Sequence, residues 1–446
     1  MAAQDVREQS EVTAYPPGPR LPALLQGAWY QLNRQRFISA SARRYGDVFA
    51  LRVPPFADNA VVFSRPEHIK EIYAGNPRDM HAGEGNQILG TIMGQHSLLL
   101  TDEDEHARAR RLLMPAFNGS ALRGYRDLVT EIAIAEINSW TTRSTLITLD
   151  RMNALTLEVI TQVVFGVTDA QTRAELTPRL KRIVHLNPLV FLGFQSALLA
   201  RFGPWKRFAD NLHELDALLY AEIAGRRRAP DLTERTDVLS TLLHAGTGDD
   251  DDPPLTDAEL RDQLITLLLA GHETTASALS WALYEIAAHP AIQAEAYDAA
   301  RDGDEKYLEA VLKEAMRLHV VINGTNRKLT RDMTIGGRRL PAGTVVNTSI
   351  LLAHGNPDSH PDAGAFRPDR FLTGEVAPNT WFPFGGGVRR CIGAGFSLME
   401  GTAVLREILL RHTLSLPEGA KPEQPKTRNI TTVPRGKARL VLTPRT

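Results

Sequence analysis

Cysteine is nearly absent from this chain, which has one such residue, Cys391, among 446. A lone cysteine excludes an internal disulfide, and it excludes a zinc or iron–sulfur site built from several thiolates. It also indicates no dependence on an oxidising compartment. The ordinary interpretation of one isolated cysteine is a small buried hydrophobe, and a ligating or reactive thiol is the alternative.

The chain also lacks an excess of charge of either sign and any long apolar run. Its 51 Lys and Arg nearly balance its 52 Asp and Glu, for a net charge of −1. Without a basic surface, we expect no nucleic-acid partner. The N-terminus, Met1–Ser10, is polar and has no signal-peptide core. No uncharged apolar stretch is long enough to span a bilayer, so we expect no transmembrane anchor and a cytoplasmic location.

The pattern along the chain predicts one large, mainly α-helical domain with small β-sheets. No internal repeat is visible, and the apolar fraction of 43% is sufficient for a sizeable core. We expect a disordered polar tail over 1–14 and a single domain over 15–446. Alternating apolar residues and turn signals place the β-rich parts at about 46–64, 334–351 and 418–446.

The longest predicted helix follows an acidic run, Asp249–Asp252, which we interpret as a solvated linker. Thr256 and Glu259 have the spacing of a capping box at the start of this helix. Pro290 marks its end. About 33 residues at the α-helical rise give roughly 50 Å, enough to cross a domain. Because its apolar residues lie on several faces, we expect the helix to be central and buried.

The middle of this helix contains an unusual group of small and polar residues, Ala270-Gly-His-Glu-Thr274. Gly271 costs about 1 kcal/mol relative to alanine inside a helix. Ala270 and Thr274 share one face. If that face meets a flat cofactor, the small residues leave room for a diatomic ligand, Thr274 can donate a hydrogen bond to it, and Glu273 can relay protons. The alternative is a kinked or capped helix with a back-bonding threonine.

Two further clusters contain charged residues whose role depends on whether they meet in the folded protein. Glu314 and Arg317 have i,i+3 spacing, and Arg370 is a candidate third partner. An exposed pair of this kind is worth only ~0.2–0.5 kcal/mol, whereas losing one partner of a buried network costs ~3–5 kcal/mol. His106 and Arg110 share a helical face and can bind a carboxylate together; a solvated basic face is the alternative.

The neighbours of the single cysteine change its interpretation. Cys391 lies in Phe384-Gly-Gly-Gly-Val-Arg-Arg-Cys391-Ile-Gly393. Glycine lets the backbone approach a flat object closely, and arginine offers a rigid set of donors to anionic groups. A thiolate held in such a loop suits one axial bond to an iron.

These motifs, in their order and spacing, resemble those of the cytochrome P-450 family over roughly residues 15–440. The loop around Cys391 resembles the haem-binding signature, Ala270–Thr274 the oxygen-binding helix, and Glu314, Arg317 and Arg370 the structural core triad. The resemblance implies the cytochrome P-450 fold, mainly α with small sheets, in which one long central helix crosses a buried haem.

The resemblance also implies a role for each matching residue. Cys391 would be the axial ligand of the iron of haem b, with O₂ as co-substrate. Thr274 and Glu273 would serve oxygen activation and proton delivery. The other cofactor-binding residues implied are His106, Arg110, Ala270, Gly271, Arg327, Phe384, Gly387, Arg389 and Gly393.

The chain departs from the common family pattern in three places. Val320-Val321 replaces a frequent Pro-Pro pair, and His106 stands where many members have tryptophan. The Pro16–Pro19 segment resembles the hinge of membrane-anchored members, but only a short polar tail precedes it. The resemblance is therefore to a soluble, bacterial-type member.

The expected activity is insertion of one oxygen atom from O₂ into a C–H bond of an apolar small molecule, such as a fatty acid, terpene or steroid. We expect 82–98, 186–205 and 320–325 to form the substrate walls; ordinary core packing, or a patch that touches a membrane surface, are the alternatives for the apolar segments. No flavin or iron–sulfur segment is visible, so electrons are expected from a separate ferredoxin and its reductase, with Arg389 and Arg390 able to attract an acidic partner.

Two other activities fit parts of the sequence. A haem-thiolate enzyme that uses peroxide, or that rearranges its substrate without electron partners, needs Cys391 but commonly lacks the acid–alcohol pair Glu273-Thr274. A catalytically silent haem-binding protein also needs Cys391 but not Thr274.

Overall fold

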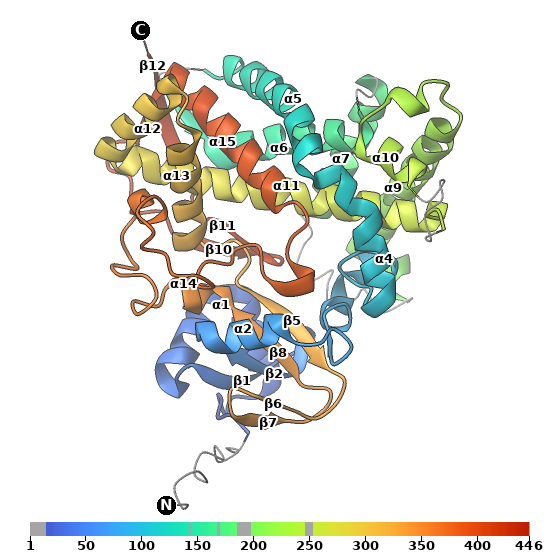
Figure 1. Cartoon of the computed structure of the whole chain (residues 1–446), viewed down its shortest axis with the longest axis vertical. Helices are drawn as coiled ribbons and strands as arrows, with labels where there is room; N and C mark the ends of the chain where they lie inside the picture. The colour runs from blue at the N-terminus through green and yellow to red at the C-terminus, as the bar shows by residue number, and fades with distance from the viewer. Residues whose placement is uncertain (1–14, 142–143, 167–169, 185–197, 246–252, 446) are drawn as a thin grey trace, which may run out of the picture.

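The computed structural model describes residues 15–141, 144–166, 170–184, 198–245 and 253–445. A large helical part and a smaller β-rich part form one body (Figure 1). The expected tail over 1–14, the acidic run 249–252 and most of the apolar segment 186–205 lie outside the described residues. The mainly α-helical class with small sheets is confirmed.

Helices account for most of the ordered chain. They are α1 Ala23–Tyr45, α2 Pro66–Ala74, α3 Gly90–Met93, α4 Glu103–Leu113, α5 Gly119–Asn138, α6 Thr148–Phe165, α7 Ala170–Val184, α9 Gly203–Arg227, α10 Val238–His244, α11 Asp257–Ala288, α12 Pro290–Asp302, α13 Glu305–Leu318, α14 Ile350–His354 and α15 Ala394–Arg411.

The strands are short and belong to several small sheets. They are β1 Val48–Val53, β2 Ala57–Phe63, β3 Met80–His81, β4 Thr145–Ile147, β5 Gly324–Leu329, β6 Met333–Ile335, β7 Arg338–Leu340, β8 Val345–Ser349, β9 His412–Ser415, β10 Pro425–Arg428, β11 Thr431–Pro434 and β12 Arg439–Pro444. The strands expected in 46–64, 334–351 and 418–446 are all present. The sequence pattern did not reveal β3, β4, β5 and β9.

The main sheet has the strand order β1-β2-β8-β5-β3. β2 and β8 run parallel, with Val61 opposite Val346, and the other neighbours are antiparallel. Val61 and Val346 are fully buried, as expected for apolar residues on a covered sheet face. This sheet and the β6–β7 hairpin form the lower part of Figure 1. The sheet places β5, and with it Arg327, below the central helix.

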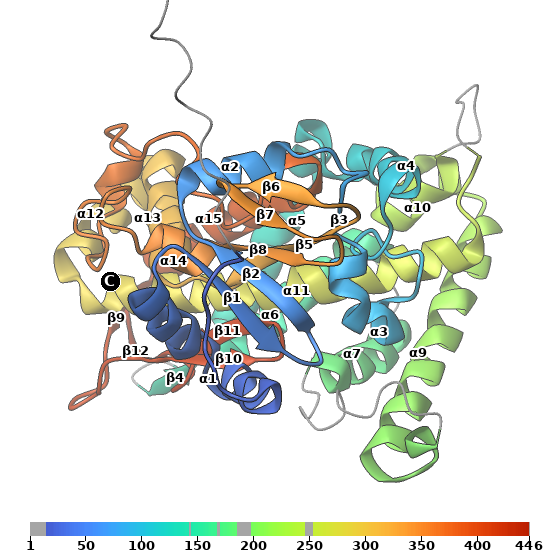
Figure 2. The ribbon, with the colours of Figure 1, turned by 90° about the horizontal axis from the view of Figure 1, so that it is seen from below.

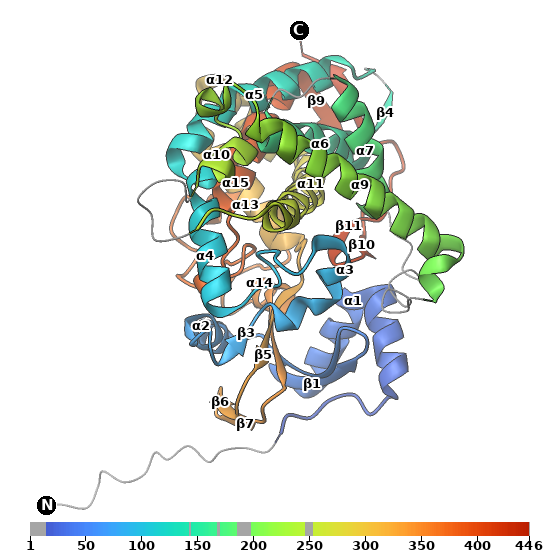
Figure 3. The same ribbon diagram turned by 90° about the vertical axis from the view of Figure 1, so that its right-hand side faces the viewer.

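The central helix is α11, which spans 32 residues and crosses the helical part of the molecule (Figure 2). Its capping box is present: the Glu259 N–H donates to Thr256 Oγ1 at 3.2 Å, and the Thr256 N–H donates to Glu259 Oε2 at 2.8 Å. Figure 3 views this helix nearly end-on, with other helices around it. Because it is apolar on most faces, it is buried along most of its length, as predicted.

The C-terminal part of the chain returns to the central helix. α15 packs along α5, and the β10–β11 hairpin lies against α11. The hairpin pairs Arg428 with Thr431, so Asn429 and Ile430 form its tip. The fold thereby brings three distant segments to the middle of α11: the loop before α15, the sheet strand β5 and the tip of the C-terminal hairpin.

Candidate haem-thiolate active site

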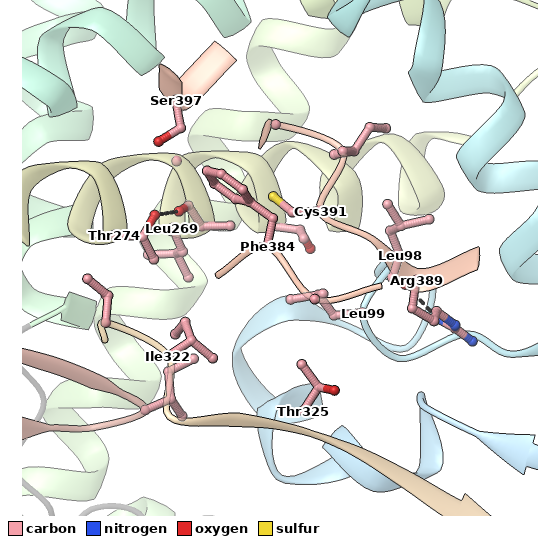
Figure 4. Close-up of a pocket in the computed structure, with 18 of the residues that line it drawn as sticks. Leu98, Leu99, Leu269, Thr274, Ile322, Thr325, Phe384, Arg389, Cys391 and Ser397 are labelled. Atoms are coloured by element: carbon pink, nitrogen blue, oxygen red, sulfur yellow. Dashed lines mark hydrogen bonds between the residues drawn. The ribbon is translucent and has the colours of Figure 1, made fainter. Parts of the chain in front are cut away.

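A cavity of about 440 Å³ lies between the middle of α11 and the loop that precedes α15. Figure 4 shows Cys391 and Phe384 on this loop and Thr274 on α11, all at the same cavity. Ala270 is exposed although it belongs to a buried helix, because the cavity opens against it. The remaining wall is mostly apolar, with Leu98 and Ile322 among its residues.

The cysteine loop is closed by a hydrogen bond from the Cys391 N–H to the Phe384 carbonyl oxygen, at 2.9 Å. Its glycines allow a close approach to α2. A Cβ on Gly387 would lie 2.1 Å from the carbonyl oxygen of Tyr73, and Gly387 has a φ of +63°, a conformation that disfavours other residues. Gly387 therefore shapes the loop and does not line the cavity itself. Gly393 lines it at the N-cap of α15.

The thiol of Cys391 is reached from the cavity. Burial raises the pKa of the Cys391 thiol, whereas the Gly393 N–H and the positive charges of Arg110 and Arg390 lower it. A metal ion supplies the stronger stabilisation that a coordinated thiolate requires. The sulfur is thus placed for one bond into the cavity.

One edge of the cavity gathers four basic side chains from α4, β5 and the cysteine loop: His106, Arg110, Arg327 and Arg389. Burial, with the charges of Arg389, Arg110 and Arg327, lowers the pKa of His106 to about 3. Burial also lowers the pKa values of Arg110 and Arg327, and that of Arg389 to about 10. A bound anionic group would offset this desolvation and mutual repulsion.

Thr274 keeps both features that its sequence context suggested. Its Oγ1 donates to the Ala270 carbonyl oxygen at 2.7 Å, the back-bonded arrangement, and its side chain also lines the cavity. Gly271 lines the cavity too, but a Cβ on Gly271 would lie 2.9 Å from Ile160 Cδ1 of α6. The glycine therefore also permits the close packing of α11 on α6.

Glu273 turns its carboxylate toward the C-terminal hairpin. Its Oε1 accepts hydrogen bonds from Arg428 Nε and, at 2.7 Å, from Thr431 Oγ1. The residue is only 7% exposed, and these two donors offset the free-energy cost of burying its carboxylate. Sequence reasoning missed Arg428 and Thr431, because no local pattern connects a hairpin to a residue 155 positions earlier.

The three residues of the core triad meet in the interior, each at most 1% exposed. Arg317 donates to both carboxylate oxygens of Glu314, at 2.7 and 2.8 Å, and Arg370 Nε donates to Glu314 Oε1 at 3.1 Å. Arg317 also donates to the carbonyl oxygen of His354 at 3.1 Å. The surface-pair alternative for Glu314 and Arg317 is therefore wrong.

His354 extends this network to the cysteine loop, and the sequence did not single it out. Its Nε2 accepts the Phe382 N–H at 3.0 Å, two residues before Phe384. Burial, with the charges of His360 and Arg317, holds the pKa of His354 well below its usual range. The neutral imidazole needed as the acceptor is thus the favoured form.

The residues present fit a haem. The cavity is lined by the cysteine, by the small residues Ala270 and Gly271 of α11, and by the basic side chains of His106, Arg110, Arg327 and Arg389, which match the carboxylates of a haem. Among the described residues no group of three or more His, Cys, Asp or Glu could hold a metal ion by itself. Fold and site together are those expected of a haem protein, and Cys391 is the residue that would bind its iron.

Comparison with known proteins agrees with this class. The sequence model of the cytochrome P-450 family matches residues 16–441. The Mycobacterium tuberculosis protein designated cytochrome P-450 135A1 is 59% identical over 432 residues, which cover 97% of this chain and 96% of that protein. The Mycobacterium bovis protein designated cytochrome P-450 135B1 is 42% identical over 431 residues, with 95% and 90% coverage.

The solved structure of retinoic acid-bound cyanobacterial CYP120A1 superposes with a TM-score of 0.85 at 25% identity, covering 97% of this chain and all of that one. The chain belongs to the cytochrome P-450 family. It is accordingly a haem-dependent monooxygenase, an oxidoreductase that uses O₂. Among the described residues, no helix is long and apolar enough to cross a membrane.

Some residues of the segments expected to form substrate walls line the cavity. Leu89, Ile92 and Met93 of the segment 82–98 line the cavity, and so do Val320 and Val321. The segment 186–205 is described only from Leu198 onward, so most of the expected roof lies outside the described residues.

Proposed function

We propose that this protein hydroxylates an apolar small molecule at a C–H bond, with haem b bound through Cys391 and with electrons from separate carrier proteins. The observation that carries the proposal is that Cys391 and the Ala270–Thr274 segment of α11 line the same cavity. Haem b is the form proposed because the chain has no second cysteine for a thioether attachment.

When bound, a thiolate-ligated haem supplies the activation of O₂ by favouring cleavage of the O–O bond. The chain supplies position and protons. His106, Arg110, Arg327 and Arg389 would hold the haem carboxylates. Thr274 Oγ1 would donate its proton into the cavity after breaking its bond to the Ala270 carbonyl. Glu273, beside it, would replenish that proton from the side of Arg428 and Thr431.

The apolar wall supports a lipid-like substrate such as a fatty acid, terpene or steroid, because burial of apolar surface is the main force such a wall can offer. The relative CYP120A1 is described with retinoic acid, itself an apolar chain ending in a carboxylate. This class of substrate is therefore the one we propose here.

Electrons would come from a ferredoxin and its reductase in the cytoplasm. Arg390 and Val388 of the cysteine loop are exposed on the surface, where a basic residue would attract an acidic carrier. Neutralising Arg390 should slow reduction of the haem more at low salt than at high salt, because screening weakens the same attraction.

The test is expression with haem, followed by two measurements. The reduced carbonyl complex should show the red-shifted Soret band of thiolate ligation, and a surrogate ferredoxin system should yield a hydroxylated product. The pair Glu273-Thr274 favours use of O₂ over the peroxide-using alternative. A normal carbonyl spectrum without product under any candidate substrate would instead indicate the silent haem-binding protein.

A further inference from the structure

A second cavity, of about 420 Å³, shares a wall with the haem cavity. Six residues line both cavities: Asn86, Leu89, Ile322, Gly324, Asn326 and Ile430. We refer to this second space as the outer cavity. Ile430, at the tip of the β10–β11 hairpin, stands between the two spaces.

The outer cavity differs from the haem cavity in chemistry. Asn323, Asn326 and Asn347 line it, and so does Arg34 of α1. The haem cavity, in contrast, is mostly apolar away from its basic edge. A molecule that occupies both spaces would therefore need a polar end and an apolar remainder.

Arg34 is an unusual residue because it is only 4% exposed. It donates to the carbonyl oxygens of Asn429 at 3.0 Å and Ile430 at 3.2 Å, and more weakly to Gln31 Oε1 at 3.4 Å. Its guanidinium carbon lies 4.5 Å from the centre of the Tyr30 ring. Its Nε has no hydrogen-bond partner among the described residues. Across the part of the chain that the structure describes, no carboxylate forms an ion pair with Arg34.

The one carboxylate in the wall of the outer cavity that could serve is already used. Glu84 binds His81 at 2.7 Å and Lys328 at 2.8 Å. A buried charge is costly unless it is paired, and neutral carbonyl acceptors only partly offset that cost. Arg34 thus remains a buried cation in the wall of a cavity, with neutral acceptors for three of its five N–H donors among the described residues.

We propose that the substrate is an amphipathic carboxylic acid whose carboxylate binds Arg34 in the outer cavity. This inference rests on the proposed function and specifies its substrate class. The apolar chain of the acid passes Ile430 into the haem cavity, where Leu89 and Ile322 continue the wall. Because the acid end is held away from Cys391, oxygen is inserted at carbons remote from the carboxylate.

The test compares dodecanoic acid with methyl dodecanoate, which has the same chain without the charge. Binding to the ferric holoprotein is followed by the shift of the haem to high spin. The acid should bind at least about tenfold more tightly than the ester, because one hydrogen bond to a charged group changes the affinity by about that factor. Equal affinities, or no binding of either compound, would overturn the proposal.

Variants locate the effect. Arg34→Gln should weaken the acid about tenfold and leave the ester unchanged, and Arg34→Lys should retain part of the preference. Arg36→Gln is the matched control, since Arg36 is exposed on the same helix, and it should bind the acid as the unaltered protein does. If Arg34→Gln binds the acid as tightly as the unaltered protein does, the proposal is contradicted. If that variant does not fold, the comparison of acid with ester still tests the proposal.

Failure of this inference is distinguishable from failure of the proposed function. A red-shifted carbonyl complex with no preference for the acid overturns the Arg34 site alone. Absence of that band overturns the thiolate assignment, while equilibrium dialysis with dodecanoate still measures the site at Arg34 without any haem signal.

Discussion

The two sides of the haem cavity are constructed differently. The cysteine side consists of one continuous loop, Phe384–Gly393, supported by the buried triad of Glu314, Arg317 and Arg370. The α11 side depends on contacts between distant segments: Glu273 with Arg428 and Thr431 of the hairpin, and the hairpin tip with Arg34 of α1. The proposed iron ligand thus lies in a local motif, whereas the basic edge of the cavity and the space proposed for the substrate depend on contacts between distant segments.

We therefore expect the cysteine side to govern the class of reaction and the α11 side to govern the choice of substrate. Changes on the cysteine side should affect every substrate equally, because they alter the iron ligand or its support. Changes on the α11 side should alter stability modestly and affect coupling or substrate choice. The following predictions test that division, beginning with the largest expected effect.

Replacing the thiol should abolish the activity. In Cys391→His the reduced carbonyl complex should lose its red-shifted Soret band, because an imidazole donates less electron density than a thiolate. Val388→Ala, at an exposed position of the same loop, should keep the band. A red-shifted band in Cys391→His would show that another residue ligates the iron.

Neutralising the centre of the triad should destabilise the fold. Glu314→Gln leaves the buried Arg317 without a carboxylate and Arg370 with only Glu375, at 3.5 Å. This should cost ~3–5 kcal/mol of unfolding free energy and reduce haem incorporation. The control is Glu309→Gln on the same helix, whose ion pair with Lys313 is partly exposed and worth at most ~1 kcal/mol. Equal denaturant midpoints for the two variants would contradict the buried network.

Removing the cavity hydroxyl should spare haem binding but uncouple the reaction. In Thr274→Ala the ratio of product to reductant consumed should fall several-fold, with electrons released as hydrogen peroxide, because the proton donor at Oγ1 is lost. Ser277→Ala removes a similar back-bond, from Ser277 Oγ to the Glu273 carbonyl at 2.8 Å, and should remain coupled. Unchanged coupling in Thr274→Ala would remove this threonine from the mechanism.

Releasing the hairpin from α11 should have a smaller effect on stability. Arg428→Gln takes the charged donor from a buried carboxylate and should cost about 1–3 kcal/mol. Lys426→Gln, exposed on the same strand, should be neutral. The carbonyl spectrum should be normal in both variants, since the cysteine side is untouched; a shifted band in Arg428→Gln would contradict the division between the two sides.

Acid should weaken the support of the cysteine loop through His354. Its pKa in the folded protein lies well below the usual value, so below about pH 6.5 the unfolded chain binds a proton that the folded protein does not. The resulting stability is complete above that pH and is lost as pH falls toward the folded pKa. His354→Gln should reduce the acid dependence of unfolding by about one proton, whereas His213→Gln, at an exposed residue, should not.

Much of the fold and site could be predicted from sequence because the relevant signals are local. The capping box at Thr256, the strands around Pro54-Pro55 and the helix after Gly393 each depend on neighbours within a few residues. Strands β3 and β5 were missed because their stability comes from pairing with distant partners and not from their own alternation. Likewise, Gly271 gave no sequence signal of its contact with Ile160.

The amino-acid sequence by itself determined the cofactor and the reaction class, since the cysteine loop and the acid–alcohol pair are contiguous motifs whose chemistry depends on residue type and spacing. The tertiary structure alone decided how Glu273 is held, that His354 supports the loop, and that Arg34 lies buried beside a polar cavity. The physical reason is that the burial of a charge and the identity of its partners depend on segments up to 396 residues apart, which no local pattern records.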